Sequence, residues 1–344
     1  MSEMDDVMEA EVRGTEIQSA VLHVLDGRHH NILLSEKTLD LDNPGIEKYV
    51  KRYVNRCRGD MRARPGTFRD NSVFARELEK YFRQETSLPQ FSAAVCGDLT
   101  SYFENEEARS FEVLFIDYRT DDVPYIAAVL LEEQETMTYI TEAENGLLCN
   151  TISFGHTALP AVSRQVASFA VVNVLNREIS FVDEGKWKDG NKVITDILLG
   201  AEAGVSRKEV VESVKEIACE VAEEFHENPT IVLSRVKNYI ADTVSEGMPL
   251  RPEILAAEMF EEKPEMGQVF MRKAEEKTLP KEVELPKASV RMSMKKQKIT
   301  TDTGIEIAFP AEYARDNSYI EFVEKGDGSI TIEIKQVNKV TNRM

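Results

Sequence analysis

Basic side chains gather between residues 48 and 69, and their types and spacing fit chemistry with phosphate. The first group falls at spacings of i, i+3, i+4 and i+8 and shares one face of a predicted helix: Lys48, Lys51, Arg52 and Arg56. The second group follows in a predicted loop: Arg58, Arg62, Arg64 and Arg69. Guanidinium forks suit phosphate oxygens, and Tyr49 or Tyr53 can stack on a base. The stretch predicts a nucleic-acid contact, and the alternative is a solvated helix face whose arginines pair with acidic side chains.

A weaker basic patch lies where a predicted helical part meets short terminal strands. Its members are Arg291, Lys295, Lys296 and Lys298. The last three are a second candidate for contact with nucleic acid. The alternative is a charged linker, and the pattern favours that alternative.

The segment Glu333-Ile334-Lys335 matches the short acid–x–lysine element of metal-dependent nucleases, with Asp316 or Glu321 as the earlier acid. The match is three residues long, which makes it weakly specific. In an alternating strand Glu333 and Lys335 share one face, while the isoleucines take the other. A solvated strand face therefore explains the segment better than a nuclease site does.

Other acids and histidines do not combine into a metal site. Asp117, Asp121 and Asp122 cluster at a predicted sheet turn and could hold Mg²⁺, but a turn built from Asp accounts for them more simply. His29 and His30 lie in another turn, and no further ligand spacing supports them. The chain has no phosphate-binding glycine loop and no nucleophile-elbow motif. We therefore expect no catalytic residue, no metal and no cofactor.

The bulk composition sets the main objection to a DNA contact. The 344 residues carry 61 acids against 42 bases, a net charge of −19, which opposes non-specific binding of nucleic acid by the whole surface. No window approaches the roughly 20 apolar residues of a membrane span, and the acidic start lacks the features of a secretory signal. Four scattered cysteines without a CxxC pair favour free thiols. We expect a cytoplasmic protein whose contact with nucleic acid is confined to a local basic patch.

The apolar runs of residues 111–131 predict the centre of the main sheet. Val113 to Ile116 and Ile126 to Leu131 are continuous apolar segments around a polar reversal at residues 119–122, as in strands that are covered on both faces. Turn sequences elsewhere in the first 200 residues connect strands as hairpins. One helix is predicted to begin at Asn43-Pro44, and two more are predicted near residues 72–83 and 89–107. The pattern indicates an α+β fold with a mainly antiparallel sheet flanked by helices.

Beyond residue 200 the chain changes in character. Ser206 to Glu209 forms a capping box, and amphipathic helices follow, with starts at Asn228-Pro229 and Pro252. Short strands are predicted at 290–294, 305–309, 318–323 and 330–334. We therefore divide the chain into an acidic tail (1–15), an α+β domain (16–200), a helical section (201–280) and a small β-rich subdomain (281–344).

Three stretches resemble the NdpA/YejK-like family of bacterial nucleoid-associated proteins. They are AVLHVLDGRHHNILLSEKTLDLD near the start, FEVLFIDYRTDDVPYIAAVLL in the middle, and GIEIAFPAEYARDNSYIEFVEKGDGSITIEIKQV near the end. The last stretch, with Phe309-Pro310 and the Asp327-Gly328 turn, carries the most specific similarity. The resemblance implies a cytoplasmic protein of the nucleoid, with DNA or a DNA-topology enzyme as partner and no established catalytic residues.

These observations lead to three functional hypotheses. The first is a non-enzymatic nucleoid-associated protein that contacts DNA directly or through a partner, with the helices beyond Ser206 supporting a homodimer. The second is an acidic protein-interaction adaptor that mimics or competes with DNA, which the net charge favours. The third is a metal-dependent nuclease.

Overall fold

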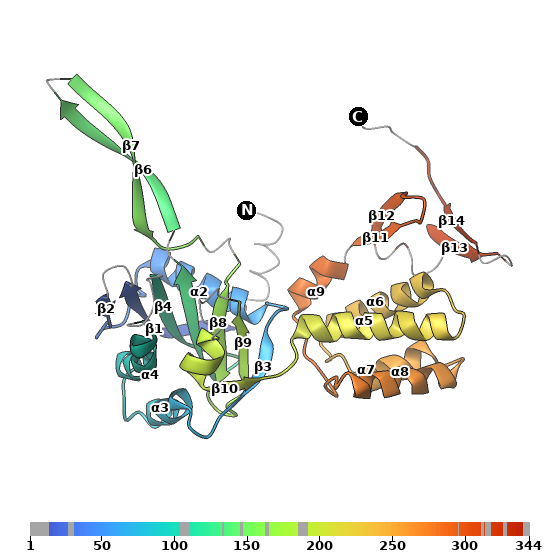
Figure 1. Ribbon diagram of the computed structural model, residues 1–344, viewed down its shortest axis with the longest axis horizontal. Coiled ribbons are helices and arrows are strands. Elements are labelled where there is room, and N and C mark those ends of the chain that lie inside the picture. Colours follow the sequence, from blue (N-terminus) through green and yellow to red (C-terminus); the bar gives the residue numbers. More distant parts are fainter. Residues whose placement is uncertain are drawn as a thin grey trace. The chain divides into compact units, whose positions relative to one another are not determined.

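A computed structural model describes residues 14–26, 31–103, 110–132, 134–144, 147–161, 165–184, 192–294, 296–310, 313, 318–325 and 329–339. The chain divides into two compact units, residues 1–204 and 205–344. The first unit contains the main sheet, and the second contains a group of helices followed by short strands (Figure 1). Our further division of the second unit into a helical section and a β-rich subdomain stays a prediction.

An antiparallel sheet of eight described strands organises the first unit, and the fold class is α+β as predicted. In spatial order the strands are β10 (Ala201–Ala203), β3 (Arg64–Phe68), β9 (Ile179–Asp183), β8 (Ser168–Asn173), β5 (Val123–Glu132), β4 (Phe111–Thr120), β1 (Thr15–Asp26) and β2 (Asn31–Leu33). Each neighbouring pair runs antiparallel. Residues 27–30, which hold the turn predicted at Asp26-Gly27, lie outside the described residues.

The predicted central hairpin is confirmed as β4 and β5, which lie inside the sheet. Successive residues of β4 alternate between two cores: Phe115 belongs to one and Leu114 to the other. The reversal falls at Asp121 and Asp122, which both have positive φ angles of 48° and 63°. Short polar residues tolerate this left-handed conformation, so the two acids serve the turn.

Helices cover both faces of this sheet. Helix α2 (Pro44–Arg58) packs on one face, and α3 (Val73–Phe82), α4 (Leu88–Phe103) and the π-helical turn η1 (Val193–Leu199) pack on the other (Figure 1). The three predicted α-helices are thus confirmed, with α4 described only to Phe103. Phe82, the last residue of α3, is 55% exposed.

Two further strands, β6 (Gln134–Glu144) and β7 (Leu147–Ala158), pair with each other in a separate two-stranded sheet and with no other described strand. Residues 145 and 146, between the two strands in the sequence, lie outside the described residues.

The second unit begins with α5 (Arg207–Glu224), whose predicted capping box is present: Ser206 Oγ accepts from the backbone N–H of Glu209, and the Glu209 carboxylate accepts from the backbone N–H of Ser206. The remaining helices are α6 (Pro229–Ser245), α7 (Pro252–Met259), α8 (Pro264–Glu276) and α9 (Lys287–Met294). The predicted strand at 290–294 was wrong, since these residues belong to α9. Two small antiparallel sheets follow, formed by β11 (Lys296–Thr300) with β12 (Glu306–Pro310) and by β13 (Ile320–Glu324) with β14 (Ile330–Ile334).

Candidate nucleic-acid interface

Helix α2 has one face fixed against the sheet and one face turned to solvent. Its start is set by Asn43, whose side-chain oxygen accepts from the backbone N–H of Gly45 at 3.0 Å, and by Pro44 at the first helical position. Val50 and Val54 are completely buried and join the core on this side of the sheet. Because that apolar face holds the helix, the polar face is presented in a defined orientation.

The four predicted cations of α2 occupy its polar side. Lys48 and Arg52 are exposed, and Lys51 and Arg56 are half-buried. Within the part of the chain that the structure describes, none of the four forms an ion pair. Arg56 also lies in the last turn, where the partial negative charge of the helix end favours a cation. The four side chains therefore keep their charge available for an anionic partner.

Arg62, by contrast, is bound on several sides by other groups of the chain. Its Nε and Nη2 donate to the two carboxylate oxygens of Asp60 at 3.0 and 2.6 Å, Nη1 donates to Glu184, and Nη2 also donates to the carbonyl of Val166 at 2.7 Å. The Arg62 side chain is only 13% exposed. The guanidinium joins the end of α2 to the segment before β8, which is a structural role.

The other arginines of the predicted loop also have internal partners. Arg58 Nη1 donates to Thr15 Oγ1 at 3.0 Å, and Arg64 Nη1 lies 3.4 Å from the carbonyl oxygen of Gly204. Arg69 Nη2 forms an ion pair with Asp196 at 3.1 Å. The segment was also wrongly expected to be all loop, since residues 64–68 form strand β3. The basic stretch thus separates into a cationic helix face and a set of arginines that tie elements together.

The aromatic part of the prediction was wrong for Tyr53. This ring is 2% exposed, and its hydroxyl donates to the carbonyl of Pro160 at 3.1 Å. Tyr49 donates to the same carbonyl at 3.0 Å, and the two rings meet edge to face with centroids 5.1 Å apart. Burial raises the pKa of both phenols, so both remain protonated donors. These tyrosines anchor the segment before β8 and are not placed to stack on a base.

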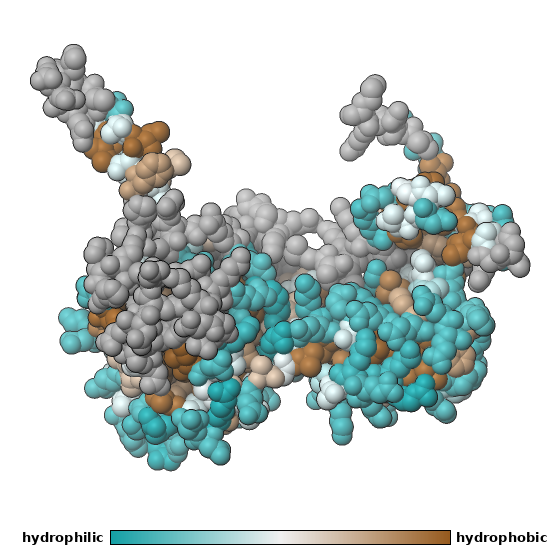
Figure 2. Space-filling view, viewed as in Figure 1, coloured by the Kyte–Doolittle hydropathy of each residue, from teal (hydrophilic) through white to brown (hydrophobic). Residues whose placement is uncertain are grey.

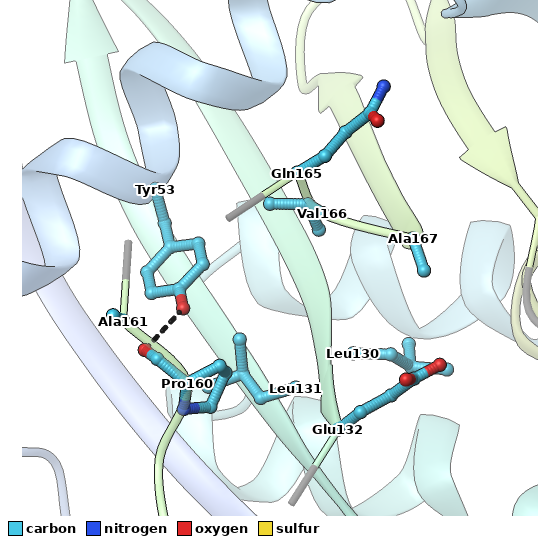
Figure 3. A pocket seen from close by; sticks show the side chains of 9 residues that line it. All are labelled: Tyr53, Leu130, Leu131, Glu132, Pro160, Ala161, Gln165, Val166 and Ala167. Atoms are coloured by element: carbon cyan, nitrogen blue, oxygen red, sulfur yellow. Dashed lines mark hydrogen bonds between the residues drawn. The ribbon is translucent and has the colours of Figure 1, made fainter. Parts of the chain in front are cut away.

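A cavity of about 130 Å³ lies beside Tyr53, between α2 and the end of β5 (Figure 3). Its described lining comprises Tyr53, Leu130, Leu131, Glu132, Pro160, Ala161, Gln165, Val166 and Ala167. The Tyr53 hydroxyl points to the Pro160 carbonyl, and Glu132 supplies the one carboxylate of this lining. The ionisable side chains among these nine residues are the Tyr53 phenol and the Glu132 carboxylate.

The second basic patch is only partly described. Lys295 lies outside the described residues, and Lys296 begins strand β11. Lys298 forms an ion pair with Glu306 across the β11–β12 ladder at 2.6 Å. Within the described part of this patch, Lys298 is therefore neutralised by Glu306 of the neighbouring strand.

The acids considered for metal binding have other roles where they are described. Asp117 accepts a 2.6 Å hydrogen bond from the Tyr81 hydroxyl. Glu321 forms an ion pair with Lys335, and Glu333 lies across the strand pair from Glu321 on an exposed position. Asp316 lies outside the described residues. Among the described residues there is no group of three His, Cys, Asp or Glu that could hold a metal ion.

Sequence analysis did not identify a role for His23, which is completely buried on β1. Its Nε2 lies 2.8 Å from Ser92 Oγ on α4, and its Nδ1 accepts from the backbone N–H of Ser35 at 3.0 Å. Burial lowers the pKa of His23 to about 4. The ring is therefore a neutral part of the core. A histidine within an otherwise apolar strand was the available signal.

Comparison with known proteins bears on almost the entire chain. Residues 21–341 match a protein-family model described as nucleoid-associated protein YejK. A search of curated proteins found no matching relative. No helix in the described part of the chain is long and apolar enough to cross a membrane.

Proposed function

Because the chain belongs to the nucleoid-associated protein YejK family, we propose that it acts at the nucleoid in the cytoplasm, without catalysis, and contacts DNA through α2. The contact surface consists of the side chains of Lys48, Lys51, Arg52 and Arg56. Lys295 and Lys296 are a second, subordinate part of the proposal, whereas Lys298 is left out because it pairs with Glu306.

One observation carries this choice of surface. On α2 the four cations have no described carboxylate partner, whereas Arg62 and Arg69 are paired with acids. The favourable energy of a cation with phosphate requires that the cation is not already neutralised, and this condition distinguishes the helix from the segment that follows it. Arg62 and Arg69 are therefore no longer among the side chains that we expect to touch DNA.

The proposal is tested by retention of duplex DNA across a salt series. Four phosphate contacts predict a slope of about −3.6 for log K against log salt, so affinity should fall on the order of 100-fold between 50 and 200 mM salt. The triple variant Lys48→Glu, Arg52→Glu and Arg56→Glu should abolish this retention. The salt slope of the unchanged protein, together with the loss of retention in the variant, identifies the contact as electrostatic.

A matched control is available on the helices of the second unit. Lys208, Arg235 and Arg272 are exposed there, and their combined replacement by Glu changes the net charge by the same amount. This control should retain DNA at low salt to within a few-fold of the unchanged protein. If it loses retention equally, net charge decides binding and the α2 surface is not the contact.

A second candidate is attachment to the nucleoid through a partner protein, and the net charge of −19 favours it. Here DNA would not be retained at any salt concentration unless a DNA-topology enzyme is added. The same assay thus separates direct contact from an acidic adaptor. Incubating DNA with the protein and Mg²⁺ or Mn²⁺ tests the absence of catalysis, and we expect the DNA to stay intact.

A further inference from the structure

One face of the β6–β7 hairpin is apolar and exposed. Two cross-strand pairs form it, Met137 with Phe154 and Tyr139 with Ile152. Side chains directly opposite each other in an antiparallel pair lie on the same face, as do residues two apart along a strand. These four residues are 74%, 58%, 79% and 67% exposed, respectively. Figure 2 shows hydrophobic residues gathered along the described part of this hairpin.

The other face of the hairpin has a different character. Thr138 pairs with Ser153, and Ile140 pairs with Thr151, so this side is mainly hydroxyl-bearing. Neither strand pairs with another described strand. A lone two-stranded hairpin is marginally stable in water, and a hydrophobic face gains stability when it packs against something. The apolar face is therefore the side from which stabilisation must come.

The chemistry around this face suits a second copy of the chain. Two molecules that each carry a net charge of −19 repel one another, and this repulsion is least opposed to association where the contacting surface is free of acidic side chains. No Asp, Glu, Lys or Arg occurs in residues 136–141 or 146–163. At the end of the apolar stripe, Thr141 and Asn150 are joined by a 2.7 Å hydrogen bond, which continues the uncharged surface.

The available area also matches a dimer. The four side chains present on the order of 500 Å² per copy, given the roughly 150–250 Å² of a large side chain. Two copies would then bury about 1,000 Å², which is the lower bound for a specific interface. The amphipathic helices, in which the sequence suggested a dimer surface, have already used their apolar faces: Val214 and Ile217 of α5 and Ile240 of α6 are completely buried within a single chain.

We propose that the chain forms a homodimer in which the apolar faces of two β6–β7 hairpins pack on each other. A two-fold axis suits this arrangement because the same patch serves both copies. The interface needs no charged contact and does not involve the cationic side of α2. A test of this dimer interface is therefore independent of whether the protein binds DNA.

The test compares the dimer dissociation constants of two single variants by sedimentation equilibrium. Tyr139→Glu places a charge in the apolar face, and it should weaken the dimer at least tenfold. Thr138→Glu is the matched control, because the neighbouring residue receives the same side chain on the opposite face. It should stay within threefold of the unchanged protein. Equal weakening by both variants, no weakening by Tyr139→Glu, or a monomeric unchanged protein at 100 μM would each overturn the proposal.

A second measurement covers the case in which a variant disturbs the hairpin itself. In the unchanged protein, hydrogen exchange of amides in 136–141 and 150–154 should slow as the concentration rises from 0.1 to 100 μM. Exchange that is independent of concentration contradicts the dimer. If exchange slows only when duplex DNA is added to a monomeric protein, the face binds nucleic acid and the proposed dimer is wrong.

Discussion

The buried ring of His23 should make the stability of the sheet depend on pH. Because the backbone N–H of Ser35 donates to Nδ1, the ring holds its own proton on Nε2 and donates it to Ser92 Oγ. A second proton would have to displace the Ser35 contact and would charge a fully buried group. For this reason the pKa of His23 falls from 6.5 to about 4 in the folded protein.

The sign and size of the effect follow from this difference. Unfolded chains bind a proton at His23 near pH 6.5, whereas the folded chain does so only near pH 4, so acid favours unfolding across that window. Integration predicts that the free energy of unfolding falls by about 2 kcal/mol between pH 7 and pH 5, and by about 3 kcal/mol at pH 4. Above pH 7 the contribution of His23 to the pH dependence disappears.

Urea unfolding at pH 7 and at pH 5 measures this loss of stability. Unfolding is monitored by pulsed hydrogen exchange on peptides from β4 and β5, because these peptides report on the main sheet alone. His23→Gln lowers stability at both pH values but should remove about 2 kcal/mol of the difference between them. Burial raises the pKa of Asp117 and of Asp183, which strengthens folding in acid; both acids remain in the variant, so their effects cancel. His226, which is exposed, provides the control His226→Gln. An unchanged pH dependence in His23→Gln would refute the reasoning.

Three further predictions follow from single contacts. Arg62→Ala should destabilise the first unit by about 2–3 kcal/mol, as expected for lost charge-assisted hydrogen bonds. Arg62→Lys should not restore this stability, because lysine cannot make the two-pronged contact with Asp60. Folded protein of both variants should still retain DNA. Ser206→Ala should lower the stability of the second unit by about 1 kcal/mol in urea unfolding, while Ser206→Thr keeps most of it. In alkylation at pH 8, Cys219 should react faster than Cys57 and Cys96, because Cys219 is only half-buried whereas the other two thiols are buried. Burial raises the pKa of all three thiols, that of Cys96 to about 12, so access of the reagent separates them; equal rates would contradict this.

The elements that the sequence predicted well are those with strong local signals. Asn43-Pro44 marks the start of α2 because both the cap and the fixed proline backbone act within one turn. The capping box at Ser206 is equally local. The run Val113 to Ile116 indicates a strand covered on both faces because no polar residue interrupts it, and each residue is buried.

The elements that were missed depend on distant parts of the chain. Strand β3 has the sequence RPGTF, which reads as a turn, because Pro and Gly are poor strand formers. In the fold, a side chain at Gly66 would meet the Phe181 ring at 2.9 Å, so the close approach of β9 requires glycine there. Segment 290–294 was assigned to a strand because five residues cannot distinguish a short buried helix from a strand.

In the candidate interface, too, the contacts that the sequence did not predict are those between distant parts of the chain. Spacing along the sequence placed four cations correctly on one side of α2, since helix geometry relates residues three and four apart. It could not reveal that Arg62 meets Glu184, 122 residues away, or that Arg69 meets Asp196. Ion pairs of this kind are set by the sheet topology, which brings the end of α2 beside the strands β8 and β9.

The strongly acidic composition does not by itself decide whether α2 can hold DNA. At 0.15 M ionic strength, screening limits electrostatic interactions between exposed charges to about 8 Å, so a phosphate at α2 responds mainly to the groups around that helix. At 0.01 M the same length is about 30 Å, and the phosphate then also feels the acids of the remaining chain. If α2 alone makes the contact, the affinity for DNA should fall as salt rises above physiological strength. At very low salt the affinity should stop increasing, whereas the affinity of a neutral protein with the same helix would continue to increase. Binding that keeps rising as salt is removed would show that the long-range field of the acids does not reach a phosphate at α2.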